Sequence, residues 1–301
     1  MLKVKNVNVY IGSKEIIQNA TFQVVPGAIV GLIGPNGAGK TTIMKTILGL
    51  TKFKGNISLS ETEVTENDHS ALAKVGALIE HPAIYPFLSG YQNLELYSKD
   101  VTDVEHIISI LEMNNYIKNK AKNYSLGMKQ KLGIAIALLN HPDLIILDEP
   151  MNGLDIEATV SIRRIIKKYA KEGTAFLISS HVLSELQKVM THVVLINEGK
   201  IIVNKNINDF NSLSHNNYKL IAENFELAKQ LFSSKGISFD SNEDEFVIKR
   251  GDLFKIQDIL YTNGLHVKEL IPLKDSFEQI IINLLNKQRG KQDGSFKGGN
   301  V

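Results

Sequence analysis

Apolar and polar positions alternate with period two over much of the first 80 residues, which is typical of β-strands with one buried face. The strands predicted from this pattern and from short apolar runs lie at residues 2–11, 21–25, 28–33, 57–60 and 75–79. The run at 28–33 follows the turn Pro26-Gly27 and is apolar throughout, so we expect a fully buried strand there. Helical spacing over 41–48 follows it directly.

Between residues 80 and 140 the pattern becomes helical, with segments at 90–97, 102–113 and 127–139 and little strand signal between them. Strand and helix then alternate again over residues 144–147, 157–170, 174–179, 183–190 and 193–197. Such alternation favours a mostly parallel sheet covered by helices. We therefore predict an α/β domain at 1–210 with a helical subdomain inserted at about 80–140.

A different order of elements begins at residue 211. The strands and helices expected from the pattern lie at 218–222, 225–233, 237–239, 246–249, 253–261 and 266–271. Their order, β-α-β-β-α-β, is the ferredoxin-like arrangement. A last helix at 276–285 completes a small α+β domain at 211–286, and the polar residues 287–301 are predicted to form a flexible tail.

Composition excludes several classes of function. The 301 residues include no cysteine, so the chain has neither disulfides nor thiolate metal sites. A net charge of +2, from 34 basic and 32 acidic residues, gives no electrostatic case for binding nucleic acid. The N-terminus reads as a strand and shows no signal peptide, and no apolar stretch approaches the roughly 20 residues that span a bilayer.

The segment Gly34-Pro35-Asn36-Gly37-Ala38-Gly39-Lys40-Thr41-Thr42 fits the phosphate-binding loop pattern G-x-x-x-x-G-K-[ST] and lies between the predicted strand and helix. Backbone N–H groups and a helix N-terminus would converge there on a polyphosphate. The residues predicted to contact ATP are Asn36, Gly37, Ala38, Gly39, Lys40, Thr41 and Thr42. Lys40 would reach the β- and γ-phosphates, and the Thr41 hydroxyl would hold Mg²⁺.

A second apolar strand, 144–147, ends in two carboxylates, Asp148 and Glu149. Ligands of open α/β sheets bind at the carboxyl ends of the strands. We expect Asp148 to hold Mg²⁺ through water and Glu149 to polarise the attacking water as general base. An acidic turn after a strand is common by itself, and the upstream loop is what favours the functional interpretation.

The segment Tyr124-Ser125-Leu126-Gly127-Met128-Lys129-Gln130 opens a predicted helix, and here the chain resembles the nucleotide-binding subunit of ATP-binding-cassette (ABC) transporters. The family signature is L-S-G-G-Q. Ser125 and Gly127 match its serine and second glycine, whereas Leu126 and Met128 depart from it. Ser125, as the residue that caps the helix N-terminus, can still offer a hydrogen-bond donor to a γ-phosphate. Gly127 can do so as well, because without a side chain its backbone can approach the phosphate closely. The resemblance implies that they act on ATP bound to the opposite subunit.

Three further segments resemble the family in the order it requires. Asn152-Gly153-Leu154-Asp155 follows the acidic pair as the D-loop does, and we assign Asp155 to the nucleotide site. His181 follows the strand at 174–179 as the switch histidine does, which contacts the γ-phosphate and orients the water. Tyr10 matches the aromatic residue that stacks on adenine.

Glu80, in Ile79-Glu80-His81-Pro82, stands where the family normally has a glutamine that touches Mg²⁺ and senses the membrane partner. A glutamine donates and accepts hydrogen bonds, whereas an ionised glutamate only accepts and adds a negative charge. With the following Tyr85-Pro86-Phe87-Leu88 segment, this glutamate resembles ATPases of bacterial exporters of the bacitracin-resistance and lantibiotic-immunity type.

The resemblance implies an ATPase subunit at the cytoplasmic face of the cell membrane. Its partners would be a transmembrane permease and a second ABC ATPase subunit, identical or different, and no nucleic acid. A generic exporter of drugs, lipids or peptides and a soluble ABC ATPase outside transport stay open as alternatives. The basic residues Arg163, Arg164, Lys167, Lys168 and Lys171 are interpreted as a solvated helix face.

Overall fold

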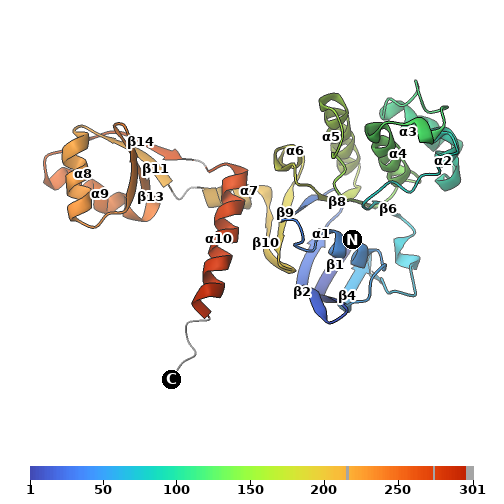
Figure 1. The fold of residues 1–301 in the computed structure, drawn as a ribbon, viewed down its shortest axis with the longest axis horizontal. Coiled ribbons are helices and arrows are strands. Elements are labelled where there is room, and N and C mark those ends of the chain that lie inside the picture. The colour runs from blue at the N-terminus through green and yellow to red at the C-terminus, as the bar shows by residue number, and fades with distance from the viewer. Residues whose placement is uncertain (215–216, 274, 296–301) are drawn as a thin grey trace. The chain divides into compact units, whose positions relative to one another are not determined.

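The computed structural model describes residues 1–214, 217–273 and 275–295. The chain folds into two compact units, which divide between Ile207 and Asn208. Strands β1 to β10 belong to the first unit, and β11 to β14 belong to the second (Figure 1).

The central sheet of the first unit has six strands in the order β10-β9-β3-β8-β7-β6. Its strands are β3 (Ile29–Ile33), β6 (Val75–Leu78), β7 (Leu144–Leu147), β8 (Ala175–Ser179), β9 (His192–Asn197) and β10 (Lys200–Asn206). Neighbouring strands pair in parallel, except β9 and β10, which form an antiparallel hairpin. Strands β3, β7 and β8 are fully buried, as their unbroken apolar sequences predict. Their carboxyl ends therefore meet at one edge of the sheet.

An antiparallel sheet of order β2-β1-β4-β5 packs beside this core. Its strands are β1 (Leu2–Ile11), β2 (Lys14–Val24), β4 (Lys54–Leu59) and β5 (Thr62–Glu63). Helix α1 (Lys40–Ile47) contributes Ile43, Met44 and Ile47 to the shared core. Strand β2 is longer than the predicted 21–25, because register shifts against β1 and a left-handed Asn19 (φ 49°) break the alternation of its first half.

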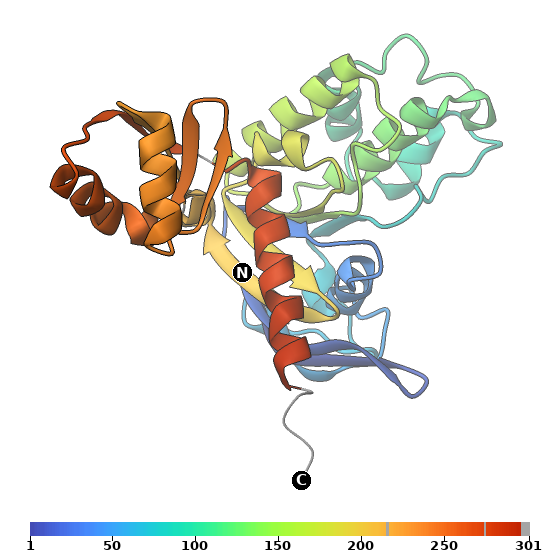
Figure 2. The ribbon, with the colours of Figure 1, turned by 60° about the vertical axis from the view of Figure 1, so that its left-hand side comes forward.

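The predicted helical insertion between β6 and β7 is present. It contains α2 (Gly90–Tyr97), α3 (Val101–Ile110) and α4 (Leu126–Leu138), and it projects away from β1, β2 and β4 in both views (Figure 1, Figure 2). Ser89 and Gln92 form a capping box at the start of α2. Helix α4 lies directly on β6, since a Cβ on Gly76 would stand 1.8 Å from the Ala137 carbonyl oxygen. The insertion is thus attached to the sheet through α4.

Two helices follow β7 and β8. Helix α5 (Ile156–Lys171) is the long amphipathic helix expected after the acidic pair, and Ile162, Ile165 and Ile166 form part of its buried face. The short helix α6 (Leu183–Gln187) covers β3, where a Cβ on Gly31 would stand 3.1 Å from Leu186 Cδ2. The predicted helix at 183–190 is therefore shorter than expected.

The second unit begins with part of α7 (Ile207–Asn211) and follows the β-α-β-β-α-β order expected from the sequence. Its elements are β11 (Asn217–Ala222), α8 (Phe225–Ser234), β12 (Phe239–Asn242), β13 (Glu245–Lys249), α9 (Leu253–Thr262) and β14 (Val267–Leu273). The strands are antiparallel in the order β12-β13-β11-β14, and Phe232 and Phe246 are fully buried between sheet and helices. The ferredoxin-like assignment stays a prediction.

The last helix, α10 (Phe277–Ser295), runs beyond the predicted 276–285. The helix thus includes residues 287–295, which the sequence assigns to the flexible tail, and 296–301 lie outside the described residues; the flexibility of the tail stays a prediction. Lys, Gln and Arg lose little rotamer freedom in a helix and extend one that has already formed. Within the described part of the chain, no helix is long and apolar enough to cross a membrane.

Candidate functional site

The phosphate-binding loop, residues 34–42, connects β3 to α1, which begins at Lys40. Gly37 (φ 77°) and Gly39 (φ 108°) adopt the left-handed backbone that glycine favours. A Cβ on Gly34 would stand 2.1 Å from the Ile196 carbonyl oxygen, so a larger residue would force the loop away from β9. The loop directs the N-terminus of α1 at a cavity of about 370 Å³. Such a helix N-terminus suits an anion.

This cavity joins the two motifs predicted to act together. It is lined by Ile16, Asn36, Gly37, Gly39, Lys40, Thr41, Thr42, Asp148 and Glu149. Ala38 is not a lining residue, because its N–H donates to the Pro35 carbonyl (3.1 Å) and its carbonyl accepts from the Gly199 N–H (3.0 Å). Ala38 thus shapes the loop from behind. Ile16 was not predicted, since nothing local to β2 marks it.

Lys40 supplies the positive charge among the lining residues. The residue is only 8% exposed, and its Nζ donates to the carbonyl oxygens of Gly34 (2.7 Å) and Pro35 (3.2 Å). Burial lowers the pKa of the Lys40 ammonium, while the charges of Glu149 and Asp148 act in the opposite direction. The ammonium is therefore held against the loop, on the side where the predicted phosphates would bind.

Asp148 directly follows β7 and connects the phosphate-binding loop to the neighbouring strand β8. Its Oδ2 accepts from the Thr41 hydroxyl at 2.7 Å, and its Oδ1 accepts from the Ser179 hydroxyl at 2.5 Å. The carboxylate is 5% exposed. Ser179 ends β8, which adjoins β7, and its role was missed because it depends on strand pairing rather than on spacing along the chain.

Thr41 and Asp148 fit a magnesium ion carried in with a nucleotide. Their side-chain oxygens are the hard ligands that Mg²⁺ prefers, and both line the cavity. Among the described residues, no group of three His, Cys, Asp or Glu side chains could hold a metal by itself. An ion at this position would take its other ligands from phosphate oxygens and water.

Glu149 and His181 meet at the mouth of the loop. The Glu149 Oε2 atom lies 2.6 Å from His181 Nδ1 and accepts from the His181 backbone N–H at 3.0 Å. Glu149 has a left-handed φ of 52° and lines the cavity, whereas His181 is not one of the lining residues. The predicted general base and switch histidine are thus brought together from the ends of two adjacent strands.

Tyr10 lies on β1 and is 47% exposed. Its hydroxyl donates to Glu15 Oε1 at 2.7 Å, and this hydrogen bond raises the pKa of the phenol. The Lys54 Nζ atom lies 5.8 Å from the ring centroid. Tyr10 is not one of the residues that line the cavity, so stacking on adenine remains an expectation.

Ser125, Gly127 and Asp155 also lie outside the cavity lining. The Ser125 hydroxyl caps α4 by accepting from the Met128 N–H at 3.2 Å, and Asp155 Oδ1 caps α5 by accepting from the Ala158 N–H at 2.7 Å. Both positions are exposed to solvent. These residues therefore take no part in the cavity of their own chain, and the action of Ser125 and Gly127 on ATP of the opposite subunit stays a prediction.

Glu80 follows β6 and also has a left-handed backbone, with a φ of 59°. Its Oε1 atom lies 2.6 Å from Nζ of Lys45 on α1, and this partner lowers the pKa of the Glu80 carboxyl. Lys45 stands one helical turn after Thr41, so the ion pair connects the start of the helical insertion to the helix of the phosphate-binding loop. The predicted contact of Glu80 with Mg²⁺ stays a prediction.

Comparison with known proteins gives consistent matches. The sequence model of the ABC transporter family matches residues 17–152. The chain is 32% identical over 305 residues to the bacitracin transport ATP-binding protein BcrA of Bacillus licheniformis, covering 95% of this chain and 97% of the relative. The chain belongs to the ABC transporter ATP-binding proteins.

Two further matches agree with the assignment of this chain to the ABC transporter ATP-binding proteins. The lantibiotic transport ATP-binding protein SrtF of Streptococcus pyogenes is 40% identical over 210 residues, covering 68% of this chain and 90% of the relative. A solved structure of an ATP-binding subunit of an ABC transporter is 27% identical with a TM-score of 0.66, covering 70% of this chain and 92% of that one. The expected ABC fold and ATPase class are thereby confirmed.

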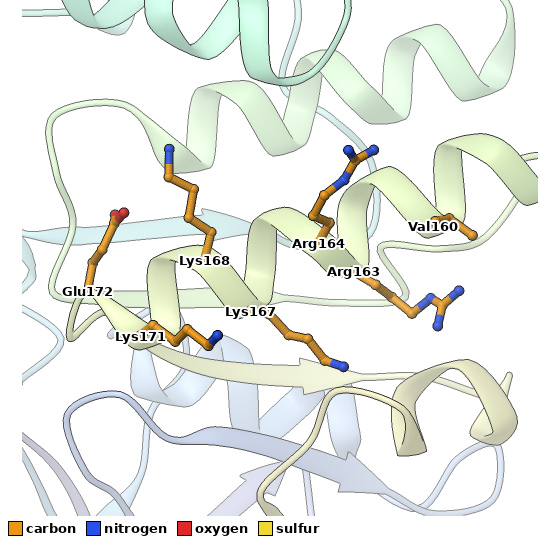
Figure 3. Close-up of a pocket in the computed structure, with 7 residues that line it drawn as sticks. All are labelled: Val160, Arg163, Arg164, Lys167, Lys168, Lys171 and Glu172. Atoms are coloured by element: carbon orange, nitrogen blue, oxygen red, sulfur yellow. The ribbon is translucent and has the colours of Figure 1, made fainter.

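The ABC ATPase also has a hollow of about 550 Å³ on α5, away from the phosphate-binding loop (Figure 3). Its lining residues are Val160, Arg163, Arg164, Lys167, Lys168, Lys171 and Glu172. Arg163 pairs with Glu185 of α6 (3.0 Å), and Arg164 approaches Glu112 (3.9 Å). The side chains point in different directions from one helix. Arg164, Lys167, Lys168 and Lys171 are exposed, as expected of a solvated face, whereas the Arg163 side chain is only 19% exposed and lies against α6.

Proposed function

We propose that this ABC ATPase binds Mg²⁺–ATP in the 370 Å³ cavity and that its hydrolysis powers a membrane exporter of antimicrobial peptides. The observation that carries the hydrolytic part is the Glu149–His181 contact at the mouth of the phosphate-binding loop. The relatives that transport bacitracin and a lantibiotic support the choice of cargo.

Binding rests on the loop and its charge. Asn36, Gly37, Gly39 and Thr42 surround the phosphates, Lys40 neutralises the β- and γ-phosphates, and Thr41 with Asp148 holds Mg²⁺. Tyr10 stacks on adenine. Since the cavity contains one cation and two carboxylates, we expect the bound Mg²⁺ to offset repulsion between Asp148, Glu149 and the nucleotide.

Hydrolysis rests on Glu149 and His181. Glu149 takes a proton from the attacking water, and the nearby imidazole fixes the direction of the carboxylate and contacts the γ-phosphate. The carboxylate already accepts two contacts from His181, so its orientation is set before the nucleotide binds. Positioning and charge neutralisation then supply most of the rate enhancement, as in phosphoryl transfer generally.

A complete site needs a second ATPase subunit. Ser125, Gly127 and Asp155 are exposed or partly exposed and lie outside the cavity of their own chain. In a head-to-tail dimer they would reach the γ-phosphate bound by the partner. Two ATP molecules would then join the subunits, and hydrolysis would release them.

The transport step needs a permease in the membrane. We place the ABC ATPase at the cytoplasmic face of the cell membrane, bound to that permease. Glu80 stands at the hinge between β6 and the helical insertion, and its ion pair with Lys45 connects this hinge to α1. Motion at the nucleotide would thus reach the insertion and through it the permease.

Deletion and complementation in the native cell test this proposal. A strain without the gene should become sensitive to bacitracin or a lantibiotic, and the wild-type gene should restore resistance. The Glu149→Gln variant should not restore it, whereas the surface control Glu157→Gln should. Unchanged sensitivity of the deletion strain to both peptide classes would reject this cargo, and active ATPase in purified protein would still leave the hydrolytic part standing.

A further inference from the structure

The backbone of Glu149 is held by contacts from several directions. Its φ of 52° is unusual for a residue other than glycine, and Pro150 follows it. Its N–H donates to the Ser179 hydroxyl (3.0 Å), and its carbonyl accepts from the Asn152 N–H (3.1 Å). Such a conformation persists only where its surroundings fix it.

Gln130 of α4 adds a contact to this backbone from the helical insertion. Its Nε2 donates to the Glu149 carbonyl at 3.3 Å, and the residue is 6% exposed. A buried amide needs a partner, so this bond fixes the side chain as well as the carbonyl. At 3.3 Å the bond is slightly longer than the ordinary range for N–H···O bonds, and a shift of α4 by about 1 Å would break it.

The same helix begins with the residues that face a partner subunit. Ser125 caps α4, and Gln130 lies in its second turn. Leu126 packs on Gly153, where an added Cβ would stand 2.5 Å from Leu126 Cδ2. The first two turns of α4 therefore carry the serine proposed to contact the partner's nucleotide and the amide that holds Glu149 at the nucleotide site of its own chain.

We infer that Gln130 is a positioning residue that couples the two ATP sites of the dimer. When Ser125 grips the nucleotide of the partner, α4 docks, and Gln130 holds the Glu149 backbone in its hydrolytic conformation. When Ser125 is released, α4 shifts and the carboxylate loses its alignment. This inference rests on the proposed dimer with shared sites.

Mixed dimers isolate the coupling. One full-length subunit carries Glu149→Gln, so only the other subunit hydrolyses ATP, and it uses the intact Ser125 of its partner. Four versions of the active subunit are then compared: the unchanged sequence, Ser125→Ala, Gln130→Met, and the double variant with both changes. Its own Ser125 faces only the inert nucleotide site, so a loss of rate on Ser125→Ala reports communication between sites.

We expect Ser125→Ala in the active subunit to lower its rate about tenfold, and Gln130→Met to lower it by a similar factor. The two changes together should cost no more than either alone, because both remove the same link. Multiplied losses, or no loss on Ser125→Ala, would overturn the inference. Absence of any hydrolysis in the reference mixed dimer would instead reject the shared-site function.

Protonation offers a second test of the bond itself. Gln130→Glu keeps the shape of the side chain but loses the donor while ionised, and burial raises the pKa of such a carboxyl. The activity of Gln130→Glu relative to Gln130→Met should therefore rise severalfold as the pH falls from about 8 to about 6. A ratio that stays constant with pH would show that Gln130 only fills space.

Discussion

The phosphate-binding loop and the N-terminus of α4 carry functional residues in opposite surroundings. Around the loop, Lys40, Asp148 and Ser179 are nearly or fully buried and bonded to neighbouring groups. At α4, Ser125 is exposed and Leu126 is 64% exposed, and neither residue lines the cavity. The first region is preorganised within one chain, and we propose that the second acts on the nucleotide of another chain.

This difference predicts which substitutions impair ATP binding or hydrolysis within a chain and which impair the action of one subunit on the nucleotide of the other. Changes at the buried region should act on the hydrolytic step or on nucleotide binding in each subunit alone. The effects of substitutions at the N-terminus of α4 should be measurable only in the dimer. The following variants are arranged from the largest expected effect to the smallest.

Glu149→Gln should have the largest effect, since it removes the general base and keeps the shape of the side chain. We expect ATP hydrolysis to fall at least about 100-fold. ATP affinity should change little, and the variant should accumulate as an ATP-bound dimer by size-exclusion chromatography. Glu157→Gln, on the exposed first turn of α5, serves as control. Equal rates for Glu149→Gln and wild type would contradict the assigned role.

Ser125→Ala in both subunits should follow, with hydrolysis reduced more than about tenfold, because each site loses both the serine of its partner and the coupling through its own α4; the ATP affinity of the isolated subunit should be unchanged. Loss of its helix cap also lowers the stability of α4 by about 1 kcal/mol. Ser89→Ala removes the cap of α2 at a similar cost and should leave hydrolysis near the wild-type level. If Ser89→Ala slowed hydrolysis equally, the effect of Ser125 would be one of stability alone.

Tyr10→Ala should weaken ATP binding about tenfold, because base stacking on an aromatic ring contributes about 1–3 kcal/mol. Tyr10→Phe loses the hydrogen bond to Glu15 and keeps the ring, so its affinity should be close to that of wild type. Isothermal titration of the isolated subunits measures both. Equal ATP affinities for Tyr10→Ala and Tyr10→Phe would show that the ring of Tyr10 does not contact the nucleotide.

Glu80→Gln should have the smallest effect on chemistry: hydrolysis persists while its coupling to transport changes. Loss of all ATPase activity would instead place Glu80 within the chemistry. The Lys45–Glu80 pair also predicts a pH dependence of stability. Since Lys45 lowers the folded pKa of Glu80 below its ordinary 4.5, the pair stabilises the fold above that value.

This stabilisation disappears as the pH falls through the lower folded pKa. The difference in denaturation midpoint between wild type and Glu80→Gln should therefore be present at about pH 7 and shrink progressively as the pH falls below the ordinary pKa of 4.5. A difference that is independent of pH would show that the ion pair contributes nothing to stability.

Local sequence patterns predicted much of the fold and most of the residues that line the cavity. The apolar runs gave β3 and β7 because strands buried on both faces need no alternation. Ser179, Gln130 and Lys45 could not be predicted, because strand pairing and helix docking bring them to Asp148, Glu149 and Glu80. Strand β10 and the extension of α10 were missed because their sequences are polar and carry weak periodicity.

Mixed dimers with a single hydrolysing subunit test the shared site most directly. One subunit is wild type, and its partner carries Glu149→Gln, either alone or together with Ser125→Ala. The wild-type subunit keeps its own Ser125 and Gln130, so the two dimers differ only in the serine that the partner offers to the active site. Because that serine is predicted to contact the γ-phosphate, we expect Ser125→Ala in the partner to lower the hydrolysis rate about tenfold. An unchanged rate would contradict the account.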